Sequence, residues 1–237
     1  ALRSNVSVWD DDPTVLFGRN REAEALNLKR LAELESESFV LKAKEELHEK
    51  TLHVNKIEGW KNALPIPVDL TLKIGAKVLF CTNKWGKYYN GETGIVRAID
   101  ADTVLVENKG ELVKVERQQY TLHENVVMEG EIKEKPLVSI EQFPLKLAYA
   151  ITIHKSQGMG IDSLVCNINT IFEKSQFYVA ISRARYPNQL LLDYHYLRFH
   201  EHLVRCVQVS PKVGEFYAKS NVLKIEELRS DSLFGEF

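Results

Sequence analysis

The stretch Leu145-Lys-Leu-Ala-Tyr-Ala-Ile-Thr-Ile-His-Lys-Ser-Gln-Gly158 carries the clearest indication of the fold. Its first eight residues are largely apolar and predict a buried strand, whereas the following residues are polar and end in a glycine. A strand that passes through a polar turn into a helix is typical of an α/β domain. Free backbone N–H groups at such a turn favour phosphate oxygens. The alternative is an ordinary polar turn in which Ser156 caps a helix.

Shorter patterns on both sides of this stretch predict further α/β elements. On the N-terminal side we expect a strand at Pro13–Phe17 and a long helix from Arg21 to about Lys50, with Glu33–Glu49 on its solvated face. On the C-terminal side we expect alternating strands and helices, at Ser163–Ile168, Glu173–Arg185, Gln189–Tyr194 and Tyr196–Val209. Together these elements predict a parallel sheet with helices packed against it.

The middle of the chain has a different pattern. Pro65 and Pro67 interrupt the preceding segment, and short β-type runs separated by turn residues follow them. We expect strands at Ala76–Thr82, Gly94–Ile99, Thr103–Glu107 and Leu112–Glu116. Short strands at this spacing predict a small antiparallel barrel, inserted between the two parts of the α/β domain.

Composition excludes several classes of protein. The 237 residues carry 31 Lys and Arg against 33 Asp and Glu, and 44% of them are apolar. The longest run without a charged residue, Ser163–Phe172, is far shorter than the ~20 residues of a membrane span, so we expect no membrane partner. The cysteines Cys81, Cys166 and Cys206 are too scattered for a disulfide framework or a zinc site, and they suit a reducing cytoplasm. We expect the location to be the bacterial cytoplasm or nucleoid. Near-neutral charge excludes a generally basic nucleic-acid coat protein but not a local binding groove.

A second segment with chemical potential is Tyr178-Val-Ala-Ile-Ser-Arg-Ala-Arg185. It places Arg183 and Arg185 near the end of an otherwise apolar helix. A planar, permanently charged guanidinium suits the charge that develops on a transferring γ-phosphoryl group. The alternative is a cation that simply complements the negative end of a helix dipole.

Taken together, Ala148–Gly158 and Tyr178–Arg185 resemble motifs V and VI of superfamily 1 helicases, and the His-Lys-Ser-Gln-Gly form resembles the Pif1/RecD/Dda-like branch, superfamily 1B. Pro13–Leu31 resembles motif IV and its helix. Lys73–Leu79 and Asn90–Val96 resemble the SH3-like domain that is inserted in this branch. The resemblance covers most of residues 13–194.

The resemblance implies a fold class and a domain organisation. The fold is α/β, a RecA-like parallel sheet domain of the P-loop NTPase type that lacks the P-loop half and carries an inserted small SH3-like β-barrel. Residues 1–70 and 141–210 would form the two parts of RecA-like domain 2A, and residues 71–140 the inserted domain 2B. Residues 211–237 would form a C-terminal tail. A chain that begins with Ala instead of Met is expected to be a piece of a longer protein.

The resemblance also implies roles for individual residues. Arg183 would be the catalytic residue, an arginine finger that reaches the γ-phosphate of ATP. Gln157 and Gly158 would line the nucleotide side of the same cleft, with Arg19 as a further ATP-binding residue. Thr152 and His154 would hold phosphates of single-stranded DNA, and Lys155 would contribute charge.

Aromatic residues in the inserted region suggest a further contact with DNA. Trp85, Tyr88 and Tyr89 lie beside Lys84 and Lys87. Aromatic rings interleaved with cations stack on bases, so we assign Trp85 and Tyr88 to DNA binding. The alternative is that at least one of these rings packs under the barrel.

Several motifs of a complete motor are not found in the sequence. Its one Gly-Lys pair, Gly86-Lys87, lacks the upstream glycine of a Walker A motif, and the acidic stretch Val6–Asp11 is interpreted as solvated surface. We expect no metal ligands, and we interpret His195, His200 and His202 as helix-surface or half-buried residues.

The sequence therefore predicts the C-terminal motor half of an ATP-dependent 5′→3′ DNA helicase. Its partners would be single-stranded DNA and the N-terminal RecA-like domain of the same protein. That missing domain would hold most of the ATP and Mg²⁺, so the chain alone is expected to bind neither and to be inactive. The alternative is a standalone module, derived from a helicase, that binds single-stranded DNA or protein.

Overall fold

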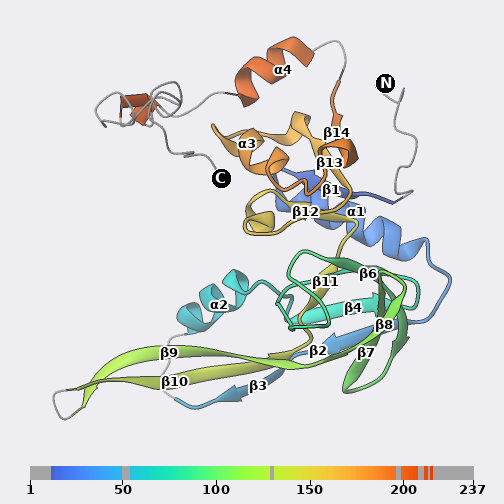
Figure 1. Cartoon of the computed structure of the whole chain (residues 1–237). Coiled ribbons are helices and arrows are strands. Elements are labelled where there is room, and N and C mark those ends of the chain that lie inside the picture. Colours follow the sequence, from blue (N-terminus) through green and yellow to red (C-terminus); the bar gives the residue numbers. More distant parts are fainter. Residues whose placement is uncertain are drawn as a thin grey trace, which may run out of the picture.

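Two β-rich regions make up the computed structural model of the chain (Figure 1). The structure describes residues 12–49, 54–128, 131–195 and 199–207, together with 211, 212, 214 and 215. The predictions for the acidic stretch Val6–Asp11 and for most of the C-terminal tail fall outside these residues. No helix in the described part is long and apolar enough to span a membrane.

The first region is a parallel sheet of four strands in the order β12-β1-β13-β14. Its strands come from distant parts of the chain: β1 (Thr14–Phe17), β12 (Ala150–Thr152), β13 (Leu164–Asn167) and β14 (Leu190–Asp193). The helices α1 (Asn20–Ala32), α3 (Gln176–Ile181) and α4 (Phe199–Cys206) accompany it. The prediction of a mixed α/β fold with a parallel sheet is confirmed.

The N-terminal helix is much shorter than predicted. It ends at Ala32, and the acidic run continues as the strands β2 (Ser38–Lys42) and β3 (Lys44–Leu47). The helix over Glu33–Glu49 was therefore a wrong prediction. The reason is tertiary: β2 pairs with β4 (Asp69–Lys73) and buries Leu41, while β3 pairs with a strand nearly 100 residues away, and such partners override local helix propensity.

The second region contains an antiparallel sheet of five strands in the order β11-β5-β6-β7-β8. The four strands predicted here are present as β5 (Lys77–Phe80), β6 (Thr93–Ile99), β7 (Thr103–Asn108) and β8 (Glu111–Glu116). The turn between β7 and β8 contains Lys109 at φ 53°. Closure of this sheet into an SH3-like barrel stays a prediction.

A long hairpin, which the sequence analysis did not predict, projects from the second region (Figure 1). Its strands are β9 (Gln118–Met128) and β10 (Glu131–Gln142), and β3 pairs with the outer edge of β10. The helix α2 (Val54–Ala63) lies in the segment between β3 and β4. The register of the hairpin shifts between Pro136 and Val138, as expected where a proline cannot donate to the ladder.

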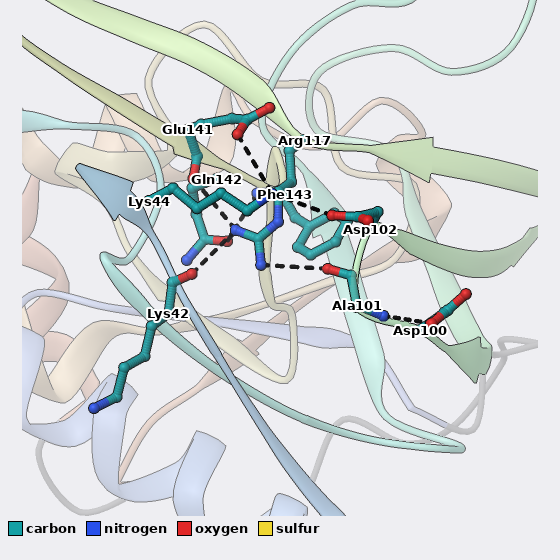
Figure 2. A network of polar contacts seen from close by, with 9 residues as sticks. All are labelled: Lys42, Lys44, Asp100, Ala101, Asp102, Arg117, Glu141, Gln142 and Phe143. Carbon is teal, nitrogen blue, oxygen red and sulfur yellow. Dashed lines mark hydrogen bonds and ion pairs between the residues drawn. The ribbon is translucent and has the colours of Figure 1, made fainter. Parts of the chain in front are cut away.

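Arg117 joins the hairpin to its neighbours at the start of β9, as Figure 2 shows. Its guanidinium donates to the carbonyl oxygens of Lys42 at 3.0 Å and Glu141 at 3.3 Å, and it lies over the Phe143 ring at 4.6 Å. Gln142 in turn donates to the carbonyl oxygens of Leu41 and Val68. Fixed guanidinium and amide donors thus tie four separate chain segments together.

The stretch Leu145–Thr152, predicted as one strand, is divided between the two sheets. Its first part is β11 (Leu145–Leu147), which pairs with β5, and its second part is β12 in the parallel sheet. Ala148 and Tyr149 form the crossing point: Thr14 donates its hydroxyl to the Ala148 carbonyl, and the Lys77 N–H donates to the Tyr149 hydroxyl. The run is largely apolar because Leu145 and the whole of β12 are buried.

Two hydrophobic cores meet at β5. Leu79 and Cys81 belong to the core under the parallel sheet, whereas Val78 and Phe80 belong to the core of the second region. Alternate side chains of a strand point to opposite faces, and β5 has a core on each face. All four of its residues, Lys77–Phe80, are therefore buried. The segment with β2 and β4 packs on the second core through Leu41, Leu70 and Leu72. The predicted domain boundary after residue 70 falls inside β4.

Candidate functional site: the segments after the parallel strands

The turn after β12 is built by its own buried hydroxyl groups. Thr152 is only 4% exposed, and its Oγ1 accepts a hydrogen bond from the Lys155 N–H at 3.4 Å. The Ser156 hydroxyl is fully buried and donates to the Ile153 carbonyl at 2.7 Å. These bonds close a short 3-10 helix, His154–Ser156, and leave His154, Lys155 and Gln157 exposed. Gly158 has φ +77°, a conformation that favours glycine.

His154 and Arg19 both contact the same neighbouring segment. His154 Nε2 lies 3.4 Å from a carboxylate oxygen of Glu173, and the Arg19 guanidinium lies over the Phe172 ring at 5.4 Å. Both side chains follow strands at the carboxyl edge of the parallel sheet, because Phe17 and Thr152 are register partners. Arg19, predicted with the ATP-binding residues, is therefore placed beside the DNA-binding candidate His154.

Arg183 lies beside the segment between motif V and β13. Ala184 pairs with Ile161, which precedes β13, so the end of motif VI is bonded to the segment that follows motif V. The Arg183 guanidinium donates to the Val179 carbonyl at 3.0 Å and to the Met159 carbonyl at 3.5 Å. The structure thus brings Arg183 to the loop that begins with Gln157 and Gly158, but not to Arg19.

The two arginines of motif VI have different partners. Arg185 forms an ion pair with Asp162 at 2.8 Å. Within the described part of the chain, Arg183 has no carboxylate partner, and its hydrogen bonds go to carbonyl oxygens and to the Ser182 hydroxyl. Its positive charge is therefore oriented but not neutralised.

A groove of about 530 Å³ lies between α1, the segment Lys61–Thr71 and the stretch Lys146–Lys155. Thr152 and Lys155, both predicted to bind DNA, line it. Asn27 in α1 also lines it, and its amide both donates to and accepts from the Ala150 backbone, at 2.7 and 2.9 Å. The motif IV helix is thus fixed to the strand that leads into motif V.

Sequence reasoning missed two lysines in this groove. Lys61 comes from α2, and its Nζ lies 2.8 Å from a Glu45 carboxylate oxygen. The hydrogen bond to Glu45 is the main reason that the pKa of Lys61 is raised. Lys146 comes from β11. A single lysine within an otherwise apolar run was the available signal, because lysine is rarely placed among buried residues unless it is paired.

The aromatic cluster of the second region is divided between surface and core. Trp85 is 90% exposed and packs edge-on against Tyr89, with ring centroids 6.4 Å apart. Tyr88 is only 3% exposed and stacks on Phe80 at 4.2 Å. The assignment of Tyr88 to DNA binding is therefore corrected: its ring packs in the core and has no free face for a base, whereas Trp85 and Tyr89 are accessible.

The described histidines and cysteines do not form a metal centre. No group of three or more potential ligands occurs among the residues that the structure describes. His195 and His200 are exposed, and the side chain of His202 lies outside the described residues. The three cysteines are buried, and burial raises the pKa of the Cys81 thiol to about 11.

Comparison with known proteins identifies the family. No family model matches the sequence. The chain is 38% identical over 224 residues to the ATP-dependent DNA helicase Pif1 of Campylobacter jejuni, an alignment that covers 92% of this chain and 50% of the relative. The chain thus spans about half the length of the curated relatives it matches.

Solved structures agree with this match. A crystal structure of a double mutant of the Pif1 helicase from Bacteroides has a TM-score of 0.72 at 26% identity, covering 90% of this chain and 46% of that one. A crystal structure of Bacteroides Pif1 bound to single-stranded DNA has a TM-score of 0.58 at 27% identity, covering 84% and 46%. The fold and the motifs are similar to those of one part of these DNA helicases. Within that class, the chain belongs to the Pif1-like family and corresponds to the C-terminal part, which carries motifs V and VI.

Proposed function

We propose that this chain is the C-terminal motor half of an ATP-dependent DNA helicase that moves 5′→3′ along single-stranded DNA. ATP and Mg²⁺ would be held mainly by a second RecA-like domain that carries the Walker motifs. In this proposal the chain supplies an arginine finger and part of the DNA-binding surface, and it does not hydrolyse ATP alone. The homology to Pif1 helicases supports the class of motor.

The observation that carries the proposal is the contrast between Arg183 and Arg185. The charge of Arg185 is paired with Asp162, whereas the Arg183 guanidinium is held by the Val179 and Met159 carbonyls and has no carboxylate partner among the described residues. An arginine finger stabilises the charge of a transferring phosphoryl group, which requires a preoriented guanidinium that is not already neutralised. Arg183 therefore meets this requirement better than Arg185. Gln157 and Gly158, in the adjacent loop, would line the nucleotide.

The DNA would bind at the carboxyl edge of the parallel sheet. Lys155 and His154 are exposed there, and Thr152 lines the groove of about 530 Å³. Single-stranded DNA binds to surfaces that combine cations for the phosphates with aromatic faces for the bases. Trp85 and Tyr89 would supply the aromatic faces from the second region.

We assign the second region to an inserted SH3-like domain. The parallel sheet takes β1 from before this region and β12, β13 and β14 from after it. An insertion of this kind leaves the motor sheet intact because its two chain ends meet at adjacent strands. Because β2 and β4 pack on the core of the second region, we place the start of the insertion soon after α1.

ATP turnover by the reconstituted motor tests this proposal. The chain would be mixed with a separately expressed N-terminal half, and ATP hydrolysis measured with and without single-stranded DNA. We expect DNA-stimulated turnover that neither half shows alone. Arg183→Ala should lower it by roughly 10³-fold or more, in the range found for arginine fingers.

Arg185→Ala is the matched control, since it removes a guanidinium from the same segment. We expect it to retain most of the turnover, apart from any loss of stability from the broken ion pair with Asp162. A larger loss in Arg185→Ala than in Arg183→Ala would reverse the assignment. DNA binding without turnover by correctly folded halves would favour the standalone binding module.

A further inference from the structure

Lys146 occupies an unusual position for a lysine. It lies in β11 between Leu145, which is fully buried, and Leu147, and this strand pairs with the buried strand β5. It lines the groove between α1 and the segment Lys61–Thr71, the same groove that Thr152 and Lys155 line. Lys146 thus brings a positive charge from the second region to the wall that carries the motif V residues.

The ammonium of Lys146 is poorly compensated. Burial lowers its pKa, the Cys81 thiol opposes this effect, and the positive charge of Lys155 lowers the pKa further. The carboxylates of Glu24 and Asp69 also line the groove. Within the described residues, however, neither forms an ion pair with Lys146 or Lys155, whereas Lys61 is held by Glu45. A half-buried cation without a counter-charge is costly, and an anion in the groove would remove that cost.

We propose that Lys146 binds a backbone phosphate of a single-stranded nucleic acid in this groove. The inference rests on the proposed function, which puts the strand against Thr152 and Lys155. The volume of about 530 Å³ lies within the range of ligand-binding clefts. Lys146 and Lys155 both line the groove, so one phosphate, or two neighbouring phosphates, would neutralise both ammonium groups.

The same chemistry could be offered by the phosphates of a nucleotide. The proposed ATP contact, Arg183, is bonded to the segment before β13, whereas the groove adjoins β12 and the turn that follows it. The phosphate at Lys146 is therefore assigned to the nucleic-acid strand, and ATP serves as the competing ligand in the test.

The salt dependence of DNA binding tests the role of Lys146. Binding of a fluorescein-labelled oligo(dT) to the full chain would be measured by anisotropy at several salt concentrations. We expect Lys146→Met to weaken binding about tenfold, as the loss of one charge-assisted contact predicts. The slope of log K against log [salt] should become shallower by about 0.7, the value for one phosphate on a single strand.

Two control variants separate a direct contact from a loss of structure. Lys146→Arg keeps the positive charge and should retain the wild-type slope. Lys29→Gln removes an exposed lysine from the part of α1 that does not line the groove, and it should change neither affinity nor slope. An unchanged slope in Lys146→Met would overturn the proposal even if its affinity were lower.

A footprint on the wild-type chain does not depend on any variant folding. The unlabelled oligonucleotide should protect Lys146 from acetylation, detected by mass spectrometry, while millimolar ATP should not. Protection by ATP alone, or no protection while the oligonucleotide is bound, would overturn the assignment. If the wild-type chain bound no DNA, the DNA contacts of the proposed function would fail together with this inference, whereas DNA binding without a role for Lys146 would refute this inference alone.

Discussion

The parallel and antiparallel regions of this chain use their polar residues in opposite ways. In the parallel sheet, the polar residues of interest lie in short segments beyond the strand ends, as in His154–Ser156. In the antiparallel region, neighbouring residues of one turn separate, so that Tyr88 enters the core while Trp85 projects into solvent. Functional side chains that follow a parallel strand are therefore neighbours in the sequence. On an antiparallel sheet, whether a side chain can bind a ligand depends on the face that it reaches.

The strongest test of this comparison is Gly18→Ala. A Cβ at Gly18 would lie 2.1 Å from the Thr170 carbonyl oxygen, a backbone atom, so the backbone would have to shift to make room. We expect the free energy of unfolding to fall by about 3 kcal/mol, at the upper end for overpacking. The loss would be measured by urea denaturation, with hydrogen exchange used to locate it.

The location of that loss decides whether the two regions are independent. Because β5 contributes Leu79 to one core and Val78 to the other, we expect faster exchange in both sheets. Faster exchange confined to β1 and β13 would mean that the regions unfold separately. Gly59→Ala is the control: nothing lies within 4 Å of the added Cβ in this helix, so it should stabilise slightly.

A second test compares Tyr88→Ala with Trp85→Ala. Removal of the buried ring that stacks on Phe80 should cost about 3 kcal/mol of stability. Removal of the exposed indole should change stability by no more than about 0.5 kcal/mol but weaken binding to oligo(dT) about tenfold, within the range for one stacked base. Urea unfolding and anisotropy would measure the two effects. A stable Tyr88→Ala variant with reduced DNA affinity would contradict the division between core and surface.

The smallest expected effect concerns the buried carboxylate Glu92. Burial alone would raise its pKa, but hydrogen bonds from Lys109, Asn108 and the Tyr89 N–H outweigh it and hold the pKa below its usual value. A carboxylate with a lowered pKa in the folded state contributes stability above the unfolded pKa of about 4.3, and this is lost as pH falls through the folded value. Glu92→Gln should therefore cost about 2 kcal/mol at pH 7.

The pH dependence makes this test specific. The difference between wild type and Glu92→Gln should shrink as the pH falls below about 4, measured by urea denaturation between pH 7 and pH 3. Glu107→Gln is the control, because its ion pair with Arg97 is partly exposed and should contribute less than about 1 kcal/mol. A difference that stayed constant with pH would mean that charge does not determine the role of Glu92.

The parts that sequence reasoning predicted correctly share one property: their signal is local. The strands β6, β7 and β8 alternate between buried and more exposed positions, β5 and the parallel strands are short, largely apolar runs, and turn residues separate β5 to β8 from one another. The helix that was predicted too long shows the converse. Its acidic run fits a solvated helix, and only pairing with β4 and β10 makes it two strands.

By itself, the sequence determined the α/β class, the likeness to a helicase and the two segments that carry it, because each is a contiguous pattern of residue types. Only the tertiary structure decided which of the two arginines of motif VI is neutralised, which of three neighbouring aromatic rings is buried, and that Lys146 lines the same groove as Lys155. Those properties depend on partners that are distant in the chain. Residue types are local, but charge compensation and burial are set by whatever the fold brings alongside.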